Sequence, residues 1–587
     1  MRSSTGREEI WERLTSEETW DLLIIGGGIT GAGILREAAR HGLRALVVEQ
    51  RDFGWGASSR SSSVIHGGFR YLFLGQFHLT RTAVRGRQEL LESAPGLVNS
   101  LGFLALDYGH GRPWHLAMDV GLGLYDTFAG YWRHKYHKAE DFQVLAPDIS
   151  PEDFHGGFQF YDAQTDDARL VWRVMQEGIR DGGAALNYAR VGSLLWEDGR
   201  VAGARVRDQE SDREAEVRAR VVVNATGAWS DHLREQVGGQ PKVRPLRGSH
   251  LLFPSWRVPA AQALTIYHPY DGRPIFLLPW QGATLVGTTD LDHGQPMDHE
   301  PRISPEEVTY LMAAVEYLYP SLRIGLDDVI ATYAGVRPVV ATNKDNPSAE
   351  PREYAIWEEQ GLVTATGGKL TTFHTAALEL LELVRDRLPD LGPINKEPVF
   401  NSKHDDHPSD ATANIPQRLV GRYGHAAADL VASARDGELE PIAGTQFTWA
   451  EVRWSARHEA VVHLDDLLLR RVRVGLFLPT GGEAILPRVC AICQEEPGWD
   501  DSRWAAEQER YLALWNTAYA LPERESIRDW HALLEEAMQK RQARRQKRRK
   551  ITRLALTGGT IAGAALALTG AKARRAGKMR QSSHIES

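Results

Sequence analysis

Cysteine is almost absent from this chain of 587 residues, since only Cys490 and Cys493 occur. Two thiols exclude a disulfide framework as the source of stability. Their C-x-x-C spacing lies in an apolar, helix-like stretch, LPRVCAICQEE, and no second pair or histidine cluster completes a metal site. We therefore expect two buried helical thiols and no metal ion.

A secretory signal is lacking as well. Met1 to Thr19 is polar and charged, and no apolar run precedes the first predicted strand, so the catalytic body is expected to stay in the cytoplasm. The body also lacks net positive charge. Residues 540–587 hold 14 Lys and Arg against one acid, Glu586, and this tail of charge +13 leaves −21 for residues 1–539, because the whole chain carries −8. We expect no nucleic acid as a partner of such a body.

The tail contains an uncharged run. The basic segment 540–550 precedes 18 uncharged residues, 554–571, which would span roughly 27 Å as a helix, the low end of what crosses a bilayer. Three interpretations stay open: a spanning anchor, a helix lying on anionic lipid, or a tail that binds nucleic acid. We favour membrane lipid, at the cytoplasmic face, because a purely electrostatic tail needs no apolar stretch.

The rest of the chain has an ordinary globular composition, and 587 residues exceed one core, so two or three domains are expected. Residues 21–49, DLLIIGGGITGAGILREAARHGLRALVVE, predict a strand, a glycine turn, a helix and a second strand that ends in an acid. Gly26 would make the turn, Gly28 would leave room for a pyrophosphate, and Gly31 would let helix and strand pack closely. Glu49 would bind a ribose hydroxyl pair. This order favours a dinucleotide site over a glycine turn without a ligand.

The next segment, RDFGWGASSRSSSVIHGGFRYL, is rich in small and hydroxyl residues. The stretches 56–59 and 61–63 offer many donors and little bulk, as a pyrophosphate and the edge of a flavin require. Gly67 and Gly68 allow the backbone to approach a planar ring, and Arg70 offers a fork of donors for an oxyanion. On these residues alone, a serine-rich surface loop is an equal alternative.

Together, GGGITGAG, the serine-rich segment and IHGGFRYL resemble the FAD-dependent, quinone-linked glycerol-3-phosphate dehydrogenases, within the amino-acid-oxidase-like flavoproteins. Further matching segments are YDAQTDDARL, VVVNATGAWSD, RGSHLLFP, LLPWQGATLVGTTD, YAGVRPVV and TGGKLTTF. The resemblance covers residues 18–385 and, more loosely, a helical region to about residue 535. It implies that FAD is the cofactor and that the chain has an α/β fold with a Rossmann-like FAD-binding domain. Alternating apolar strands between Pro245 and Asp290 predict an inserted antiparallel-sheet substrate domain.

These patterns give predicted boundaries. The FAD-binding domain is expected at 18–90, 160–245 and 330–385, the substrate domain at 91–159 and 246–329, a C-terminal helical domain at 400–539, and the tail at 540–587. The polar loop 405–417 is the expected linker. In the helical domain, Asp465, Arg470 and Arg471 are expected to form surface ion pairs.

The resemblance also indicates residues that contact FAD. Val191 would lie near adenine, and Thr226 and Gly227 would present their backbone to the pyrophosphate and adenosine. A helix that begins near Thr371 would point its N terminus at the flavin N1–C2=O region, where negative charge develops on reduction. The full predicted cofactor set is Gly26, Gly28, Gly31, Glu49, Ser58, Ser59, Gly67, Gly68, Val191, Thr226, Gly227, Gly368, Lys369, Leu370 and Thr371.

Catalysis would need a cation clamp, because hydride transfer from a phosphorylated secondary alcohol to flavin N5 leaves a phosphate and an emerging alkoxide to hold. We expect Arg70 with Tyr71 on the phosphate, and Arg337 with Lys369 near the reacting oxygen. The resemblance also shows two departures. The family usually has basic residues where this chain has Ser63 and His374, so local positive charge is expected to be lower.

The reaction also needs a base. His66 and His250 are alternative bases, since imidazole can titrate near neutral pH, and Thr288 completes the candidate catalytic set. A lone histidine on an apolar strand, such as His250, is more often a core residue than a catalyst.

The predicted reaction is therefore the oxidation of sn-glycerol 3-phosphate to dihydroxyacetone phosphate. Quinone is the expected electron acceptor, because the tail suggests a membrane. NAD is not expected, because the sequence shows no second dinucleotide-binding fingerprint, and oxygen is the alternative acceptor. Two other classes stay open. One is a flavin oxidase of an amino acid or 2-hydroxy acid, whose carboxylate clamp needs only one arginine, and the other is a flavin-bearing membrane protein without catalysis.

Overall fold

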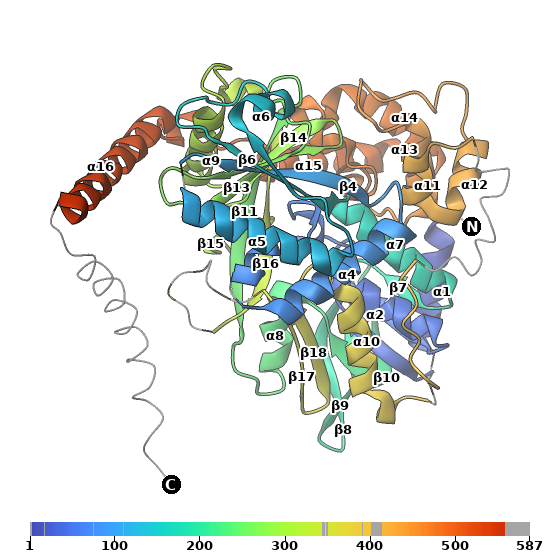
Figure 1. Cartoon of the computed structure of the whole chain (residues 1–587). Helices are drawn as coiled ribbons and strands as arrows, with labels where there is room; N and C mark the ends of the chain where they lie inside the picture. Colours follow the sequence, from blue (N-terminus) through green and yellow to red (C-terminus); the bar gives the residue numbers. More distant parts are fainter. Residues whose placement is uncertain are drawn as a thin grey trace, which may run out of the picture. The chain divides into compact units, whose positions relative to one another are not determined.

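A computed structural model describes residues 3–557, except for 17, 74, 110, 343, 344, 346, 348, 349, 351, 390 and 401–413. The chain divides into two compact units. The first comprises Met1–Ile266 and Pro274–Arg528, and the second comprises Tyr267–Arg273 and Asp529–Ser587. The first unit holds both sheets of the fold (Figure 1).

The first sheet is the predicted dinucleotide-binding one. Its strands run in the order β17-β18-β10-β1-β2-β7, and all neighbours are parallel except the pair β17–β18. Every residue of β1 and β2 is buried, as continuous apolar runs in a parallel sheet require. The strands are β1 (Trp20–Ile25), β2 (Ala45–Val48), β7 (Ala184–Leu186), β10 (Glu214–Asn224), β17 (Tyr354–Glu359) and β18 (Leu362–Gly367). Two antiparallel strands, β8 (Ala189–Glu197) and β9 (Arg200–Asp208), continue from β10.

Helices cover this sheet. α2 (Ile29–Arg40) packs between α7 (Asp167–Arg180) and α10 (Phe373–Leu383), and their apolar faces share a core with the buried side chains of β1 and β2. α1 (Ser3–Thr15) packs against β7 and β10. The core thus holds the glycine turn rigidly at the carboxyl end of β1.

The second sheet has ten strands in the order β15-β11-β14-β13-β12-β4-β6-β3, with β16 on β11 and β5 on β6. The pairs β11–β14, β11–β16, β13–β14 and β4–β6 are antiparallel and β4–β12 is parallel, which confirms the predicted antiparallel sheet. The strands are β3 (Val64–Ile65), β4 (Asn99–Asp107), β5 (Lys135–Lys138), β6 (Gly156–Gln164), β11 (Val243–Pro254), β12 (Ala263–Tyr267), β13 (Pro274–Trp280), β14 (Ala283–Gly287), β15 (Leu291–Asp292) and β16 (Ala331–Val340). The accompanying helices are α3 (Phe69–Phe73), α4 (Phe77–Ser93), α5 (Arg112–Ala129), α6 (Ala139–Leu145) and α9 (Pro305–Leu318), whereas α8 (Ser230–Glu235) packs against β18 of the first sheet. The domain boundaries given above stay predictions.

The C-terminal helices pack on the second sheet. Their core around Leu468 is continuous with Phe103 and Trp280 of the sheet. The helices are α11 (Gln417–Tyr423), α12 (Ala427–Ala432), α13 (Trp449–His458), α14 (Leu486–Glu495) and α15 (Asp501–Ala518). Both cysteines lie on α14 as predicted, with Cys493 buried and Cys490 half-buried.

The second unit contains α16 (Trp530–Thr557). Within the described part of the chain, we find no helix whose length and apolar character suffice to cross a bilayer. Residues 558–571 of the predicted membrane segment 554–571 lie outside the described part of the chain. Residues 405–413 of the predicted linker 405–417 lie outside it as well.

Candidate functional site

The glycine turn after β1 has the geometry of a dinucleotide cradle. Gly26 adopts a φ of +115°, which favours glycine, and a Cβ on Gly31 would overlap the carbonyl oxygen of Gly26. Ser58 Oγ accepts a hydrogen bond from the backbone N–H of Ile29 at 3.1 Å. The predicted serine therefore lies at the N terminus of α2, where a pyrophosphate would bind.

Glu49 closes this cradle at the end of β2. Its Oε2 accepts from the backbone N–H of Gly27 at 2.7 Å, and its Oε1 accepts from that of Arg51 at 2.9 Å. Burial raises the pKa of Glu49, and these two N–H groups oppose that rise. Each carboxylate oxygen keeps a second lone pair, as a ribose hydroxyl pair needs.

The remaining predicted cofactor residues come from four further segments. Thr226 turns its hydroxyl to Asn224 Oδ1 at 2.7 Å, which fixes the loop after β10, and Gly227 follows with a φ of +58°. Val191 lies on β8, half-buried against the core of the first sheet. Ser59 is buried, and Gly368 and Leu370 lie between β18 and α10. Thr371 is buried, and its Oγ1 makes no hydrogen bond to the residues that the structure describes. Such a buried hydroxyl fits a polar cofactor that would satisfy it.

Lys369 lies at the centre of one group of candidate residues. Its Nζ is 3.6 Å from the centre of the Tyr71 ring, and a Cβ on Gly68 would come within 3.1 Å of the same Nζ. This Nζ is buried and, within the described residues, makes no hydrogen bond. Burial and the charge of Arg352 lower the pKa of Lys369 to about 7. Burial, Lys369 and Arg87 lower the pKa of His66 to about 3.

Arg337 lies at the centre of a second group. It donates to Thr288 Oγ1 at 2.7 Å and to Asp290 Oδ1 at 3.1 Å. His250 is buried, stacks on Tyr333 with ring centres 4.7 Å apart, and is hydrogen-bonded to Ser62 Oγ at 2.9 Å. Burial and then Arg337 lower the pKa of His250 to about 3.

The prediction that the two imidazoles titrate near neutral pH is therefore wrong. Burial disfavours the imidazolium of His66 and of His250, and a cation lies near each ring. Both histidines are therefore neutral at pH 7, and the same causes make each a weak base.

Arg352 and Asp290 join the two groups. Arg352 donates to Asp290 Oδ2 at 2.7 Å, and its charge also acts on Lys369. Two cations, Arg337 and Arg352, therefore share the carboxylate of Asp290, and a third, Lys369, senses Arg352 as well as the carboxylates of Glu353 and Asp162. Arg70 lies on α3, but its side chain is outside the described part of the chain. Neither Asp290 nor Arg352 had been predicted: Asp290 ends the matching segment LLPWQGATLVGTTD but was given no role, and Arg352 lies in a segment with no local functional pattern.

A buried polar cluster supports the segment 66–68. The backbone N–H of Gly67 donates to the Tyr125 hydroxyl at 2.7 Å, and that hydroxyl donates to Asp162 Oδ1 at 2.6 Å. Arg87, which is fully buried, donates to the same Asp162 oxygen at 2.5 Å. The three side chains come from α4, α5 and β6, so only the fold brings them together.

The two departures from the family differ in their effect. Ser63 is buried and carries no charge. His374 is hydrogen-bonded to Glu89 at 2.8 Å and lies 3.3 Å from Glu37. Burial opposes protonation, but these two carboxylates raise the pKa of His374 to about 9. The expected loss of positive charge is therefore wrong at His374, because the imidazole is protonated at neutral pH.

Arginines of the C-terminal region hold the loop that follows Glu49. Arg471 donates to both oxygens of Asp52 at 2.7 Å, and Arg470 donates to Oδ2 at 2.5 Å. Arg473 donates to the carbonyl of Ser59 at 2.8 Å. These side chains are buried, as is Asp465, so the prediction of surface ion pairs is wrong. Their burial is compensated by carboxylates of a distant part of the chain.

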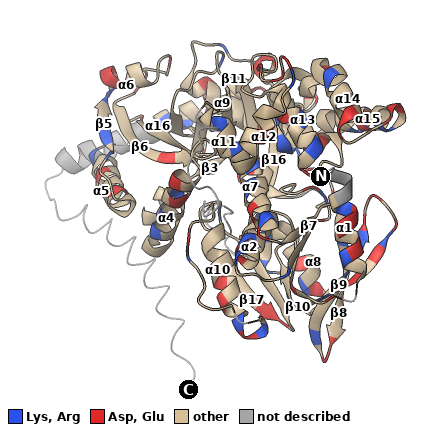
Figure 2. Cartoon of the chain, turned by 90° about the vertical axis from the view of Figure 1, so that its right-hand side faces the viewer, with Lys and Arg blue, Asp and Glu red and all other residues tan. Residues whose placement is uncertain are grey.

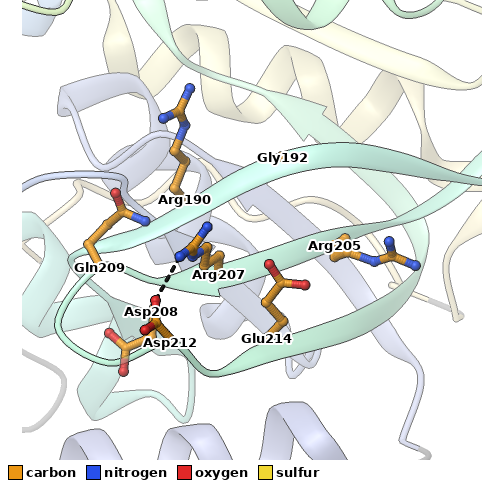
Figure 3. A pocket seen from close by; sticks show the side chains of 8 residues that line it. All are labelled: Arg190, Gly192, Arg205, Arg207, Asp208, Gln209, Asp212 and Glu214. Carbon is orange, nitrogen blue, oxygen red and sulfur yellow. Dashed lines mark hydrogen bonds and ion pairs between the residues drawn. The ribbon is translucent and has the colours of Figure 1, made fainter.

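One cavity of the described part of the chain lies on the strands β8 and β9 and the start of β10 (Figure 3). It has a volume of about 480 Å³, and its charged side chains come from β8, β9, β10 and the turn between β9 and β10. Arg207 pairs there with Asp212 at 2.6 Å, and both are exposed. A smaller cavity, about 210 Å³, lies between α4 and α10 and is lined in part by Thr371 and His374. None of the predicted catalytic residues lines either cavity.

These features define a dinucleotide-binding oxidoreductase: a parallel sheet with this glycine turn, an acid at the end of β2, and a second sheet that bears cations. The chain belongs to the FAD dependent oxidoreductase family, which residues 21–383 match, and its cofactor is FAD. Residues 399–504 match the C-terminal domain of alpha-glycerophosphate oxidase.

Relatives agree with this assignment. The chain is 35% identical over 398 residues to the aerobic glycerol-3-phosphate dehydrogenase of Bacillus subtilis, a match that covers 66% of this chain and 71% of that protein. It is 31% identical over 500 residues to the protein of the same name from Staphylococcus aureus, covering 80% and 89%. The solved structure of glycerol-3-phosphate dehydrogenase from Bacillus halodurans, complexed with FAD, is similar with a TM-score of 0.70 and 25% identity, over 88% of this chain and 98% of that one. The predicted resemblance, fold class and cofactor are thus confirmed.

Gly31→Ala tests the cradle. The added Cβ would overlap the carbonyl oxygen of Gly26, so the turn must shift, and we expect FAD to bind at least about tenfold more weakly, because the backbone must approach the pyrophosphate closely. The measurements are the flavin-to-protein absorbance ratio and a titration of the apoprotein with FAD. Gly325→Ala is the control, because a Cβ there meets no atom within 4 Å. Unchanged affinity in Gly31→Ala would contradict this account of the turn.

Proposed function

We propose that this protein oxidises sn-glycerol 3-phosphate to dihydroxyacetone phosphate, delivers a hydride to N5 of FAD, and passes the electrons to a membrane quinone. The observation that carries the proposal is the pair Arg337 and Arg352 on the carboxylate of Asp290, with the buried cation of Lys369 within the electrostatic reach of Arg352. Several cations suit a phosphate dianion, whereas the carboxylate of an amino acid needs one arginine. The names of the relatives from Bacillus and Staphylococcus support the same substrate.

The side chains divide the work by their chemistry. Lys369, above the Tyr71 ring, would hold the reacting oxygen together with Arg337, and Arg70 with Tyr71 would bind the phosphate. FAD, when bound, supplies a two-electron acceptor for the hydride. His66 and His250 are the candidate acceptors of the hydroxyl proton; both are neutral at pH 7, and their lowered pKa makes each a weak base in the protein without substrate.

Quinone as acceptor is supported by the tail, which combines a cluster of cations with the uncharged residues 554–571. A protein held at the cytoplasmic face of the membrane by this tail would reach the quinone pool directly. Oxygen is the alternative acceptor.

Anaerobic bleaching of the flavin tests the reaction. Addition of glycerol 3-phosphate to the yellow holoprotein should remove the flavin absorbance, whereas an amino acid or a 2-hydroxy acid should leave it. A soluble quinone should then restore the colour faster than air does. Bleaching by an amino acid and not by glycerol 3-phosphate would overturn the proposed substrate, and faster recovery in air would overturn the proposed acceptor.

A further inference from the structure

Glu307 is a buried carboxylate in the first turn of α9. Its side chain is 1% exposed, and α9 packs against β11 and β14; Figure 2 shows α9 beside β11. Its Oε1 accepts hydrogen bonds from Ser249 Oγ at 2.9 Å and from Thr289 Oγ1 at 2.6 Å. Its Oε2 accepts from the backbone N–H of Ser304 at 2.9 Å and pairs with Arg247 at 2.8 Å. These donors fix the carboxylate in one orientation, as a fully satisfied buried network does.

Through Thr289, the carboxylate holds the segment that binds Arg337. The Thr289 hydroxyl that donates to Glu307 also accepts a backbone N–H of β11 at 2.8 Å, so this side chain is held from two sides. The carbonyl oxygen of Thr289 accepts from Arg337 at 3.3 Å. Thr288 Oγ1 and Asp290 Oδ1 accept from the same guanidinium at 2.7 and 3.1 Å. Three consecutive residues therefore orient the guanidinium, and Glu307 holds the middle one.

The same carboxylate also holds the strand that carries His250. Ser249, which donates to Glu307, lies on β11 between Gly248 and His250. Successive side chains of a strand point to opposite faces, so Ser249 faces α9 while the two neighbouring positions face the site. A Cβ on Gly248 would lie 2.1 Å from Arg337 Nη2, so β11 and the guanidinium are in close contact. Glu307 therefore holds both segments that surround the guanidinium, β11 and the residues after β14.

We propose that Glu307 is a positioning residue for the oxidation of glycerol 3-phosphate, because through Thr289 it orients the guanidinium of Arg337 toward the reacting oxygen of the substrate. The inference rests on the function proposed above, in which Arg337 holds this oxygen together with Lys369. Donors that stabilise developing negative charge are most effective when they are in place before the reaction, since reorientation during the reaction costs energy. The effect of Glu307 is therefore expected on the rate of flavin reduction.

Helix capping is the alternative role of Glu307. Its Oε2 accepts from the backbone N–H of Ser304, and Ser304 Oγ accepts from the N–H of Glu307 at 3.3 Å, which closes a capping box at the start of α9. The contacts with Ser249 and Thr289 use the other oxygen, Oε1. Substitution of Thr289 therefore removes the connection to the site and leaves the capping box in place.

Stopped-flow reduction of the flavin in the holoprotein separates the two roles. In Thr289→Val, which lacks the hydroxyl, the limiting rate of reduction by glycerol 3-phosphate should fall about 10- to 100-fold, the usual cost of a misplaced catalytic group. The Kd of the substrate should stay within about twofold, because this interaction strengthens in the transition state. Thr289→Ser keeps the hydroxyl and should restore the rate.

Glu307→Gln provides a second measurement. An amide has one oxygen, so it cannot accept on the Oε1 and Oε2 sides together, and reduction should slow as well. Glu451→Gln is the matched control. Glu451 is also buried, closes the capping box of α13 and pairs with Arg418 at 2.9 Å, and its partners in the described part of the chain are not candidate catalytic residues. Both glutamine variants should unfold at lower denaturant concentration, but only Glu307→Gln should slow reduction.

Two results would overturn the inference. If Thr289→Val reduces its flavin as fast as the wild type, Thr289 does not transmit an effect of Glu307 to the site. If Glu307→Gln and Glu451→Gln slow reduction equally, Glu307 acts through stability alone. A wild-type holoprotein that glycerol 3-phosphate does not bleach is a different outcome, because it would overturn the proposed function and the inference with it.

Discussion

Replacement of Lys369 by methionine is expected to lower kcat/KM for glycerol 3-phosphate by about 10²–10³-fold, the usual cost of losing one donor that stabilises developing negative charge. The Nζ of Lys369 is buried and finds no hydrogen-bond partner within the described residues, although it lies only 3.6 Å from the centre of the Tyr71 ring. An ammonium in that setting can donate to a substrate oxygen at little cost in reorganisation. Methionine keeps the length of the side chain and removes only the charge and the donors. Stopped-flow reduction of the flavin would measure the effect on the chemical step.

Lys242→Met is the matched control. Lys242 also lies over an aromatic ring, 4.8 Å from the centre of Trp357, but it is exposed and lies outside the site. The same substitution there should leave kcat/KM unchanged. A similar loss in both variants would show that cation–π contacts affect the protein in general and that Lys369 has no special role.

The pH dependence of kcat/KM tests the same residue. Because burial and Arg352 lower the pKa of Lys369 to about 7, its cation is present below that pH and is lost as the pH rises through it. The rate should therefore fall on the alkaline side of pH 7. Lys369→Arg keeps the charge at every pH used and should remove this fall, even if its absolute rate is lower. An identical pH profile in the two proteins would assign the fall to another group.

The dinucleotide half of the site was predictable because its signals are local. Gly26, Gly31 and Glu49 lie within one strand–turn–helix–strand unit, and the period of the apolar residues fixes that unit without help from the rest of the chain. The strands of the second sheet were likewise indicated by alternation over a few residues. The cation pair of Lys369 and Arg337 was predicted through a family resemblance, which carries information that periodicity does not.

What the sequence did not indicate depends on contacts between distant segments. Asp290 and Arg352 join the two cation groups, yet each is an ordinary charged residue in its own segment. The arginines at 470 and 471 follow three leucines, and a polar pair after an apolar run is typical of a surface. Their burial depends on Asp52, which lies 418 positions before Arg470. His374 was expected to reduce the local positive charge. The carboxylates that keep its imidazole protonated, those of Glu37 and Glu89, lie on two other helices, so the sequence around His374 does not reveal them.

Asp52→Asn should destabilise the protein by about 3–5 kcal/mol, the usual cost of breaking a buried ion pair from one side. Asp52 is buried and accepts from both Arg470 and Arg471, so the amide would leave two buried guanidinium groups without their shared carboxylate. The same loop carries Ser58 and Ser59, so FAD should also be released more readily. Denaturant unfolding of the holoprotein, followed by flavin fluorescence and by circular dichroism, would measure both effects.

Asp212→Asn is the control for this network. Asp212 also pairs with an arginine, Arg207, but both side chains are exposed, and loss of such a pair costs about 1 kcal/mol or less. The contribution of Asp52 should also depend on pH. Burial alone would raise its pKa, but Arg471 and Arg470 hold the pKa below its usual range. A lowered pKa stabilises the folded chain above about pH 4, and this stabilisation is lost as the pH falls further. The difference in stability between wild type and Asp52→Asn should therefore shrink in acid, and a difference that grows in acid would contradict an ionised Asp52.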